Sequence, residues 1–477
     1  MVVGELAQER DVIIIGGGPA GYTAAIRAAQ LGREVTLIEK EDLGGICLNK
    51  GCIPSKVFSR VSAKFSEVKK LSSFGITAGE PALHFPDTQE YRKKTVLNLR
   101  KGVEALCREN KIEVLKGTAS FLAAGKIGVE NGDAFDIYRY QSALIAAGGI
   151  LKPAMKKSGR ILNARNLYEI TELPEELLVY GDDYIAIEAA FSFQNMGSKV
   201  TVITEKGFSW LDAAVEKELL RQMKKAKIQV KKQWRLEDTA EEDGRVQAFF
   251  RNEAGEPVSL HGTCIYIQSE AVPDLKELGA DRLGLELDEA GKIKTDSSCK
   301  TSISGIWAAG DIASGPMLAV KAIRQGKTAA ESIAGLAAEY DGTLLPTVIH
   351  SQPPIAAAGM TEEEAAASGY SVKTGQFSLT GNGYASVKNE KDGLIKVISD
   401  EETEILLGIH IIGDGALELI STGITALEMA AREEDLTFPF YPHPSINEGL
   451  LEAVEALAGK AIHLVPKKTF AAAGKKA

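Results

Sequence analysis

Two cysteines, Cys47 and Cys52, stand five residues apart in the segment GGICLNKGCIPSK, which runs from Gly44 to Lys56. On one regular helix this separation means ~7.5 Å of rise and about 140° of rotation. The Cα atoms of a disulfide lie within about 7 Å of each other, so at least one of the two cysteines must lie off such a helix. The segment therefore predicts a redox-active dithiol.

The residues around the pair favour a reactive Cys52. Flanking glycines supply a permissive backbone, and Pro54 suits the first turn of a helix that begins near Cys52. The positive end of that helix and Lys56 would both favour thiolate over thiol. The alternatives are two buried structural cysteines or half of a zinc site. Zinc would need two more close ligands. The other cysteines, Cys107, Cys264 and Cys299, are scattered singly along the chain, so we expect no metal.

Length, charge and cysteine content narrow the class of protein. The chain has 477 residues, enough for about three domains. Its formal charge of −10 argues against nucleic acid or an anionic membrane surface as the main partner. Five cysteines are sparse and odd in number, which fits a reducing compartment. The start MVVGELAQERD does not resemble a signal peptide, and no apolar run approaches the ~18 residues that span a bilayer. We expect a soluble, cytoplasmic protein.

A strand, a glycine turn, a helix and a second strand are expected from Asp11 to Lys40, which makes a βαβ unit. Gly16, Gly18 and Gly21 form a GxGxxG motif directly after the apolar strand, and Glu39 ends the second strand. These positions would supply a tight turn, close approach to a pyrophosphate, helix–strand contact and an acceptor for ribose hydroxyls. With strand, helix and acid in register, the motif indicates an intact dinucleotide site.

The same pattern returns 165 residues later, from Leu177 to Lys206, where Gly181 corresponds to Gly16. The apolar strands and the helix recur, so a second dinucleotide-binding fold is expected. Its ligand-binding positions differ from the first copy: Asp183 replaces Gly18, Ala186 replaces Gly21 and Thr204 replaces Glu39. Only the fold signal survives intact.

The altered motif predicts a closed nucleotide site. A carboxylate at Asp183 would face a pyrophosphate, and like charges ~4 Å apart repel by about 1 kcal/mol in water and about 4 kcal/mol at an effective dielectric of about 20. Aspartate is also a good helix N-cap, so Asp182 or Asp183 could satisfy the amides that would otherwise bind phosphate. The alternative is that a neighbouring loop adapts and NAD binds weakly, with Glu205 replacing the missing acid.

Two later segments carry polar residues at element ends. In Thr301–Gly335 a short apolar strand ends at Gly310 and Asp311; this can be an ordinary turn, but beside the intact repeat we favour Asp311 as an acceptor for a flavin ribityl or phosphate-proximal group. Near the C-terminus, His443 and Glu448 form HPxxxE. A dithiol that is oxidised or formed needs a proton acceptor, and a histidine oriented by a carboxylate serves near neutral pH. A lone surface histidine before a proline would instead be structural.

These motifs together resemble the flavoprotein disulfide reductase family, and within it the lipoamide dehydrogenases, along nearly the whole chain. The resemblance implies an FAD site that includes Gly16, Gly18, Gly21, Glu39, Gly45, Lys56, Gly148 and Asp311. It also implies that Cys52 lies nearest the flavin and that Cys47 exchanges with the substrate disulfide. His443, supported by Glu448, would be the acid and base contributed by the second subunit of a homodimer. Lys56 would pair with Glu188.

The departures from the family cluster on the nicotinamide side. The second GxGxxG reads GDDYIA (181–186), Thr204 takes the place of the usual acid or arginine, and Glu270 and Ala271 replace a Gly-Arg pair. Pro354 replaces a frequent Glu in the dimerisation region, and this change has no physical account. The resemblance therefore supports the dithiol and FAD and supports NAD(H) poorly.

We expect an α/β chain with two Rossmann-like dinucleotide-binding domains and a C-terminal α+β dimerisation domain. Residues 1–149 and 275–344 would bind FAD, 150–274 would form the degenerate NAD-binding-like domain, and 345–477 the interface domain with a basic tail. The predicted function is an FAD-dependent dithiol/disulfide oxidoreductase acting on a small dithiol or a lipoyl domain, with oxygen, a quinone or a redox protein as electron partner. The alternatives are an ordinary NAD-dependent lipoamide dehydrogenase and a flavin-bearing regulatory or binding subunit.

Overall fold

The computed structural model describes residues 7–152 and 158–465 and divides the chain into two compact units. Unit 1 comprises the described residues up to Gly207 together with Lys227–Thr343. Unit 2 comprises Phe208–Ala226 and the described chain from Leu344 onward. No helix in the described ranges is both long and apolar enough to cross a membrane.

Unit 1 begins with the predicted βαβ unit. The sheet order is β3-β2-β1-β6-β5-β4, and β17 pairs with the end of β6. The strands β3, β2, β1, β6 and β17 run parallel. The strands β4 and β5 form an antiparallel extension. The strands are β1 Ala7–Ile15, β2 Val35–Glu39, β3 Glu113–Lys116, β4 Thr118–Ala123, β5 Lys126–Asn131, β6 Ala134–Ile145 and β17 Ile306–Ala308. The helices are α1 Pro19–Gln30, α2 Gly45–Asn49, α3 Cys52–Val68, α4 Phe85–Glu109 and α7 Ala319–Ile333.

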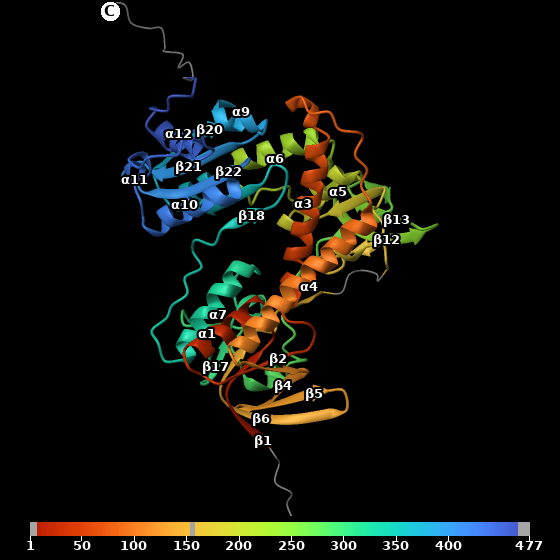
Figure 1. The fold of residues 1–477 in the computed structure, drawn as a ribbon, viewed down its shortest axis with the longest axis vertical. Coiled ribbons are helices and arrows are strands. Elements are labelled where there is room, and N and C mark those ends of the chain that lie inside the picture. Colours follow the sequence, from red (N-terminus) through yellow and green to blue (C-terminus); the bar gives the residue numbers. More distant parts are fainter. Residues whose placement is uncertain (1–6, 153–157, 466–477) are drawn as a thin grey trace, which may run out of the picture. The chain divides into compact units, whose positions relative to one another are not determined.

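The continuous apolar run of β1 explains why this sheet is covered on both faces. Val12 and Ile14 pack with the small residues of α1, which itself lies beside α7 (Figure 1). Ile13 and Ile15 pack on the opposite face with residues of β4, β5 and β6. The alternation of side chains along a strand thus sends neighbouring residues into two separate cores.

The second copy of the βαβ pattern also folds as predicted, within unit 1. Its parallel sheet has the order β11-β10-β9-β15-β8. The elements are β8 Ile161–Leu162, β9 Glu176–Tyr180, α5 Tyr184–Met196, β10 Lys199–Thr204, β11 Gln229–Lys232 and β15 Cys264–Ile267. A meander, β12 Arg235–Glu242, β13 Arg245–Arg251 and β14 Pro257–Gly262, and a two-stranded ribbon, β7 Ile150–Leu151 with β16 Ala271–Val272, complete the unit. The offset of 165 residues places the start of α5 where α1 predicts it.

Unit 2 is an antiparallel sheet with helices, in the order β18-β19-β22-β21-β20. Its strands are β18 Thr347–Ile349, β19 Ile355–Gly359, β20 Val372–Ser378, β21 Leu394–Asp400 and β22 Leu406–Ile412. Its helices are α6 Ala213–Lys225, α8 Glu362–Ala367, α9 Gly383–Lys388, α10 Ala416–Glu428, α11 Glu433–Thr437 and α12 Glu448–Leu457. Segregated helices and an antiparallel sheet make this the predicted α+β domain.

Helix α6 belongs to unit 2 although it follows β10 in sequence. Lys396 of β21 donates to both carboxylate oxygens of Asp212, the N-cap of α6, at 2.8 and 3.1 Å. The Lys396 and Asp212 side chains are only 5% and 1% exposed, and Glu362 also contacts Lys396 at 2.5 Å. Removing one partner would leave a buried charge unpaired, so this ion pair holds the start of α6 on the sheet of unit 2.

Candidate functional site

The two cysteines occupy consecutive helices. Cys47 lies in the five-residue helix α2, and α3 begins at Cys52, which confirms the predicted helix start. At least one cysteine was expected to lie off a shared helix. Both lie in helices, but in different ones, because Gly51, with φ −114° and ψ −97°, separates α2 from α3. Both thiols are free, and they form a hydrogen bond with each other.

The two thiols have opposite proton affinities. The hydrogen bond between them raises the pKa of Cys47 well above its ordinary value of 9.0, and burial adds to the rise. The same hydrogen bond lowers the pKa of Cys52; burial opposes this, and the ammonium of Lys56 assists it. The helix N-terminus stabilises negative charge at the same position. The arrangement therefore favours Cys52 over Cys47 as the thiolate of the pair.

Lys56 joins the dithiol to the second dinucleotide fold. It lies one helical turn after Cys52 on α3, so the two side chains share a face. Its Nζ donates to the two carboxylate oxygens of Glu188 on α5 at 2.8 and 3.0 Å. Glu188 is 1% exposed. A thiolate, an ammonium and a buried carboxylate thus form one chain of alternating charge.

A cavity of about 320 Å³ adjoins the dithiol. The predicted residues that line it come from the glycine turn, the dithiol helices, the end of the first sheet and the loop after β17: Gly16, Gly18, Glu39, Gly45, Cys47, Cys52, Lys56, Gly148 and Asp311. The structure thus brings the GxGxxG motif and the thiols to one cavity. Gly21 and Glu188 support it from behind: a Cβ on Gly21 would stand 1.8 Å from the carbonyl oxygen of Gly16, so only glycine allows this packing of α1 on β1.

The cavity suits an elongated dinucleotide such as FAD. Gly18 caps α1 without a side-chain hydrogen bond in the described part of the chain, and a Cβ there would meet only the Cα of Gly45, at 3.8 Å, within 4 Å. The first amides of α1 and the space beside them therefore remain available for a phosphate. The carboxylate of Glu39 accepts from the amides of Gly17 and Glu41 at 2.6 Å each. This fixes the acid at the cavity wall, where lone pairs remain for ribose hydroxyls.

Two basic residues that the sequence analysis did not single out also serve this cavity. Arg165 lines it, and its buried Nε has no hydrogen-bond partner among the described residues. Lys321 of α7 is fully buried, and its Nζ donates to the carbonyls of Gly310 and Ala313, at 3.0 Å each, which flank Asp311. Burial lowers the pKa of Lys321 to about 8 and raises that of Asp311. The orphaned donor of Arg165 favours an anionic ligand in the cavity, whereas the charge of Lys321 is partly compensated by Asp311.

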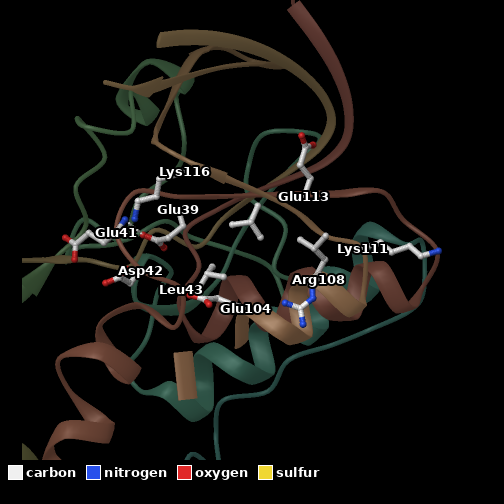
Figure 2. Close-up of a pocket in the computed structure, with 11 residues that line it drawn as sticks. Glu39, Glu41, Asp42, Leu43, Glu104, Arg108, Lys111, Glu113 and Lys116 are labelled. Carbon is white, nitrogen blue, oxygen red and sulfur yellow. Dashed lines mark hydrogen bonds between the residues drawn. The ribbon is translucent and has the colours of Figure 1, made fainter. Parts of the chain in front are cut away.

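Figure 2 shows a second cavity, of about 590 Å³, formed by the end of α4, by β3 and by the loop after β2. Glu39, Glu41 and Asp42 line both cavities. In Figure 2, Lys116 lies beside Glu39, whereas Lys111 points away at the other end. The remaining wall mixes both signs of charge, and none of the predicted site residues except Glu39 reaches it.

The altered second motif keeps the backbone conformation of the first at Asp183 but not at Gly181, which lacks the positive φ of Gly16, and it changes what its amides bind. Asp183 has φ −79° and ψ 175°, close to the −72° and −174° of Gly18. Its side chain accepts from the amide of Ala186 at 2.8 Å, as the N-cap of α5. Ala186 is buried at the position where a Cβ on Gly21 of the first copy would lie 1.8 Å from the carbonyl oxygen of Gly16.

Gln268, which directly follows β15, contacts the turn before α5. Its Oε1 accepts from the amides of Asp182 and Asp183 at 2.8 and 3.2 Å. A Cβ on Gly181 would lie 2.6 Å from the same oxygen, so the amide side chain fills the turn. Of these two amides, that of Asp182 corresponds to the Gly17 amide, which Glu39 binds in the first copy, so the added contact of the second copy is the one at Asp183.

The remaining positions of the altered motif are also occupied by local contacts. The hydroxyl of Thr204 lies 3.0 Å from the amide of Gly207 and 3.3 Å from its carbonyl oxygen. Glu205, the alternative ribose acceptor, receives a hydrogen bond from the hydroxyl of Tyr180. That contact and burial raise the pKa of Tyr180 to about 12. Thr204 and Glu205 therefore both make hydrogen bonds within the chain at the positions where a ribose acceptor is expected.

Replacing Asp183 by Asn should stabilise the fold at alkaline pH. Burial raises the pKa of Asp183 from 3.8 to about 6, so its stabilising contribution is complete below pH 3.8 and is lost as pH rises through 6. Ionisation then costs about 3 kcal/mol, whereas Asn caps a helix without charge. Denaturant unfolding should give Asp183→Asn an advantage of about 2 kcal/mol at pH 8 and almost none at pH 4. An equal advantage at both pH values would contradict the shifted carboxyl.

His443 and Glu448 lie in unit 2 and therefore belong to a different unit from the dithiol. His443 Nδ1 donates to Glu448 Oε1 at 2.7 Å, and the amide of Ser445 donates to Glu448 Oε2 at 2.8 Å. Burial raises the pKa of Glu448, but the hydrogen bonds from His443 and Ser445 outweigh it and hold the pKa below its ordinary value. The histidine side chain is 80% exposed, so its Nε2 can exchange protons with a ligand or a second chain.

Gln268, Arg165 and Lys321 were missed by reasoning from the sequence. Gln268 had a usable signal, because a polar residue directly follows the apolar strand CIYI at the carboxyl edge of a sheet. Lys321 had a weaker one, a charge among the small apolar residues that start α7. Arg165 sits in an ordinary loop and offered none.

Two family models match consecutive parts of the chain. The family described as pyridine nucleotide-disulphide oxidoreductase matches residues 10–326. The dimerisation domain of that family matches residues 345–454.

Individual relatives are similar along nearly their whole length. The dihydrolipoyl dehydrogenase of Geobacillus stearothermophilus is 36% identical over 472 residues, which cover 98% of this chain and all of that protein. That of Bacillus subtilis is 35% identical with the same coverage. Among solved structures, LpdA from Mycobacterium tuberculosis has a TM-score of 0.87 at 22% identity and covers 94% of this chain and 99% of its own. The HOCl-induced flavoprotein disulfide reductase RclA from Escherichia coli, in a Cu(II) complex, has a TM-score of 0.85 at 23% identity with the same coverage.

Proposed function

The chain belongs to the pyridine nucleotide-disulphide oxidoreductase family, and from that premise we propose that it moves electrons between a substrate dithiol and FAD without NAD(H) as the usual partner. It is a flavoprotein disulfide oxidoreductase that resembles dihydrolipoyl dehydrogenase. The observation that carries the proposal is the contrast between the two motifs. Side chains bind the amides of Gly17 and of the corresponding Asp182 alike, so the contrast lies one position later: Gly18 has no side chain to cap α1, whereas Asp183 caps α5 and its own amide donates to Gln268.

The residues that support dithiol exchange are Cys47, Cys52, Lys56 and Glu188, with His443 and Glu448 of a second copy in a homodimer. A substrate thiolate attacks Sγ of Cys47 in the oxidised pair, and Cys52 leaves as the thiolate. The second substrate thiol loses its proton to His443 and attacks the substrate sulfur of the mixed disulfide, which releases Cys47. The substrate thus becomes a disulfide, and its two electrons stay on the pair. Lys56 stabilises the Cys52 thiolate throughout.

FAD would be held by the amides of α1 beside Gly18, by Glu39 and by Asp311, with Lys321 and Arg165 as further positive charge. When bound, it supplies a two-electron acceptor and donor next to Cys52. The relatives named dihydrolipoyl dehydrogenase support a lipoyl-type substrate, and the matched dimerisation domain supports a homodimer. The sparse cysteines support a reducing, cytoplasmic compartment.

A second candidate, an ordinary NAD-dependent dihydrolipoyl dehydrogenase, is favoured by the names of the same relatives. Anaerobic mixing of the FAD-loaded protein with each reductant separates the candidates. Reduction of the flavin by dihydrolipoamide but not by NADH is the expected result. Bleaching by NADH at comparable speed would select the ordinary enzyme, and bleaching by neither would select a binding or regulatory subunit.

A further inference from the structure

The helix that carries Cys47 depends on other elements for its position. α2 has only five residues, and a helix this short is not stable on its own in water. Cys52, in contrast, begins the 17-residue helix α3. α2 packs beside α4, and Leu48 of α2 lies in one core cluster with Val96 and Val103 of α4. The place of the Cys47 sulfur therefore depends on how α4 holds α2.

Arg100 lies on the face of α4 that meets α2. It follows Val96 by four residues and precedes Val103 by three, so these side chains share one face of the helix. Nε and Nη2 of Arg100 donate to Oδ1 of Asn49, the last residue of α2, at 3.0 and 2.8 Å. Its Nη1 lies 3.0 Å from Oδ2 of Asp42, in the loop before α2. The planar guanidinium thus joins the loop before α2 to the end of α2.

Asn49 extends this contact to the bend that precedes Cys47. Its Nδ2 donates to the carbonyls of Gly45 and Leu43 at 2.9 and 3.1 Å. The bend is left-handed at Gly45, where φ is 59°, and a Cβ there would lie 2.7 Å from the Cα of Gly18. The bend therefore lies directly against the first glycine turn. Because Cys47 lies midway between Gly45 and Asn49, these hydrogen bonds fix the backbone on both sides of the thiol.

We propose that Arg100 and Asn49 are positioning residues that hold Cys47 where its sulfur can form a disulfide with Cys52. This inference rests on the proposed exchange at the Cys47–Cys52 pair. During exchange, Cys47 parts from Cys52 and binds the substrate sulfur, so each cycle requires the two sulfurs to meet again. That step depends on the effective concentration of one thiol at the other. The Arg100–Asn49 clamp raises this concentration without touching either thiol.

The thiol–disulfide equilibrium of the holoenzyme with glutathione, under anaerobic conditions, measures this effective concentration. One thiolate of the reduced pair attacks oxidised glutathione and releases one glutathione. The other thiolate attacks the protein sulfur of the mixed disulfide and releases the second. Two electrons and two protons thus pass from the pair to two molecules of glutathione. Acid quenching, alkylation and mass spectrometry give the fraction of the Cys47–Cys52 disulfide at each ratio of reduced to oxidised glutathione.

Arg100→Met should lower the equilibrium constant for disulfide formation by about tenfold or more, because α2 loses its polar anchor on α4. Asn49→Ala removes the other half of the clamp and should cause a loss of similar size. The double variant should lose little more than either single variant, because both substitutions break the same connection. Losses that multiply in the double variant would show that the two residues act separately, and this would overturn the clamp.

Arg92→Met is the matched control, because Arg92 makes a similar contact elsewhere on α4. Arg92 is 8% exposed, and its Nε donates to Oε1 of Gln89 at 2.6 Å. Gln89 in turn donates to the carbonyls of Tyr168 and Ile170 at 3.1 and 2.6 Å. Arg92→Met should lower stability and leave the glutathione equilibrium at its wild-type value. Equal losses in Arg92→Met and Arg100→Met overturn the inference, and so does a wild-type equilibrium in Arg100→Met.

The proposed function fails by a different result. Absence of flavin reduction by dihydrolipoamide in the wild type would refute the proposed electron transfer to FAD. The glutathione equilibrium, which needs no turnover, would still decide the role of Arg100 and Asn49.

Discussion

Replacing Cys47 by Ser should lower the rate of dithiol–disulfide exchange by about a thousandfold or more while FAD stays bound, because a hydroxyl cannot form the mixed disulfide. Cys47 lines the cavity, but the groups proposed to hold FAD, namely the α1 amides beside Gly18, Glu39 and Asp311, do not include its thiol. Stopped-flow mixing with dihydrolipoamide measures the exchange, and the ratio of flavin to protein absorbance measures the occupancy.

Cys264→Ser is the matched control for this variant. Cys264 is a free cysteine buried in β15, away from the lining residues of the cavity, so exchange should be unaffected. If Cys47→Ser loses FAD, the role of Cys47 is structural. If Cys47→Ser keeps wild-type exchange, the dithiol is not the site of chemistry.

Replacing Asp183 by Gly together with Gln268 by Ala should open the second nucleotide site. The double variant removes one carboxylate from the place of a pyrophosphate and frees the amides of residues 182 and 183 and of Ala186. Less repulsion of the pyrophosphate, together with amides that are free to bind it, should contribute about 1 to 3 kcal/mol. This corresponds to roughly a ten- to hundredfold gain in NADH affinity. Fluorescence titration with NADH measures the dissociation constants of the variant and of the wild type.

Glu205→Gln serves as the control for the opposite interpretation. If Glu205 replaced the missing ribose acceptor, this variant would weaken NADH binding, but the contact with Tyr180 predicts no change. Micromolar affinity of the wild-type protein for NADH would refute a closed site. Equal affinity of the double variant and the wild type would show that Asp183 and Gln268 are not what closes it.

The elements of both dinucleotide folds could be predicted from the sequence because their signals are local. An apolar strand, a turn and a helix of fixed length define α1, and the same spacing places α5. The start of α3 at Cys52 follows from glycine before it and Pro54 within its first turn. In each case neighbouring residues decide the structure.

What could not be predicted depends on contacts between distant residues. Gln268 binds an amide 86 positions earlier, and Lys396 binds Asp212 across 184 positions. These pairings follow from how sheets and helices stack, which no local pattern encodes. The carboxylate chemistry of Asp183 was anticipated, but the side chain that completes the closure was not.

The nearly identical backbone angles of Gly18 and Asp183 have a consequence for how this chain could change in evolution or by engineering. At Asp183 the main chain already has the conformation of Gly18, whereas Gly181 lacks the positive φ of Gly16, so a change of partner requires new side chains and a changed first residue of the turn. Two side chains, Asp183 and Gln268, occupy the amides of this turn. The second copy can therefore be altered at Asp183 and Gln268 without changing Cys47, Cys52 or the residues of the first glycine turn.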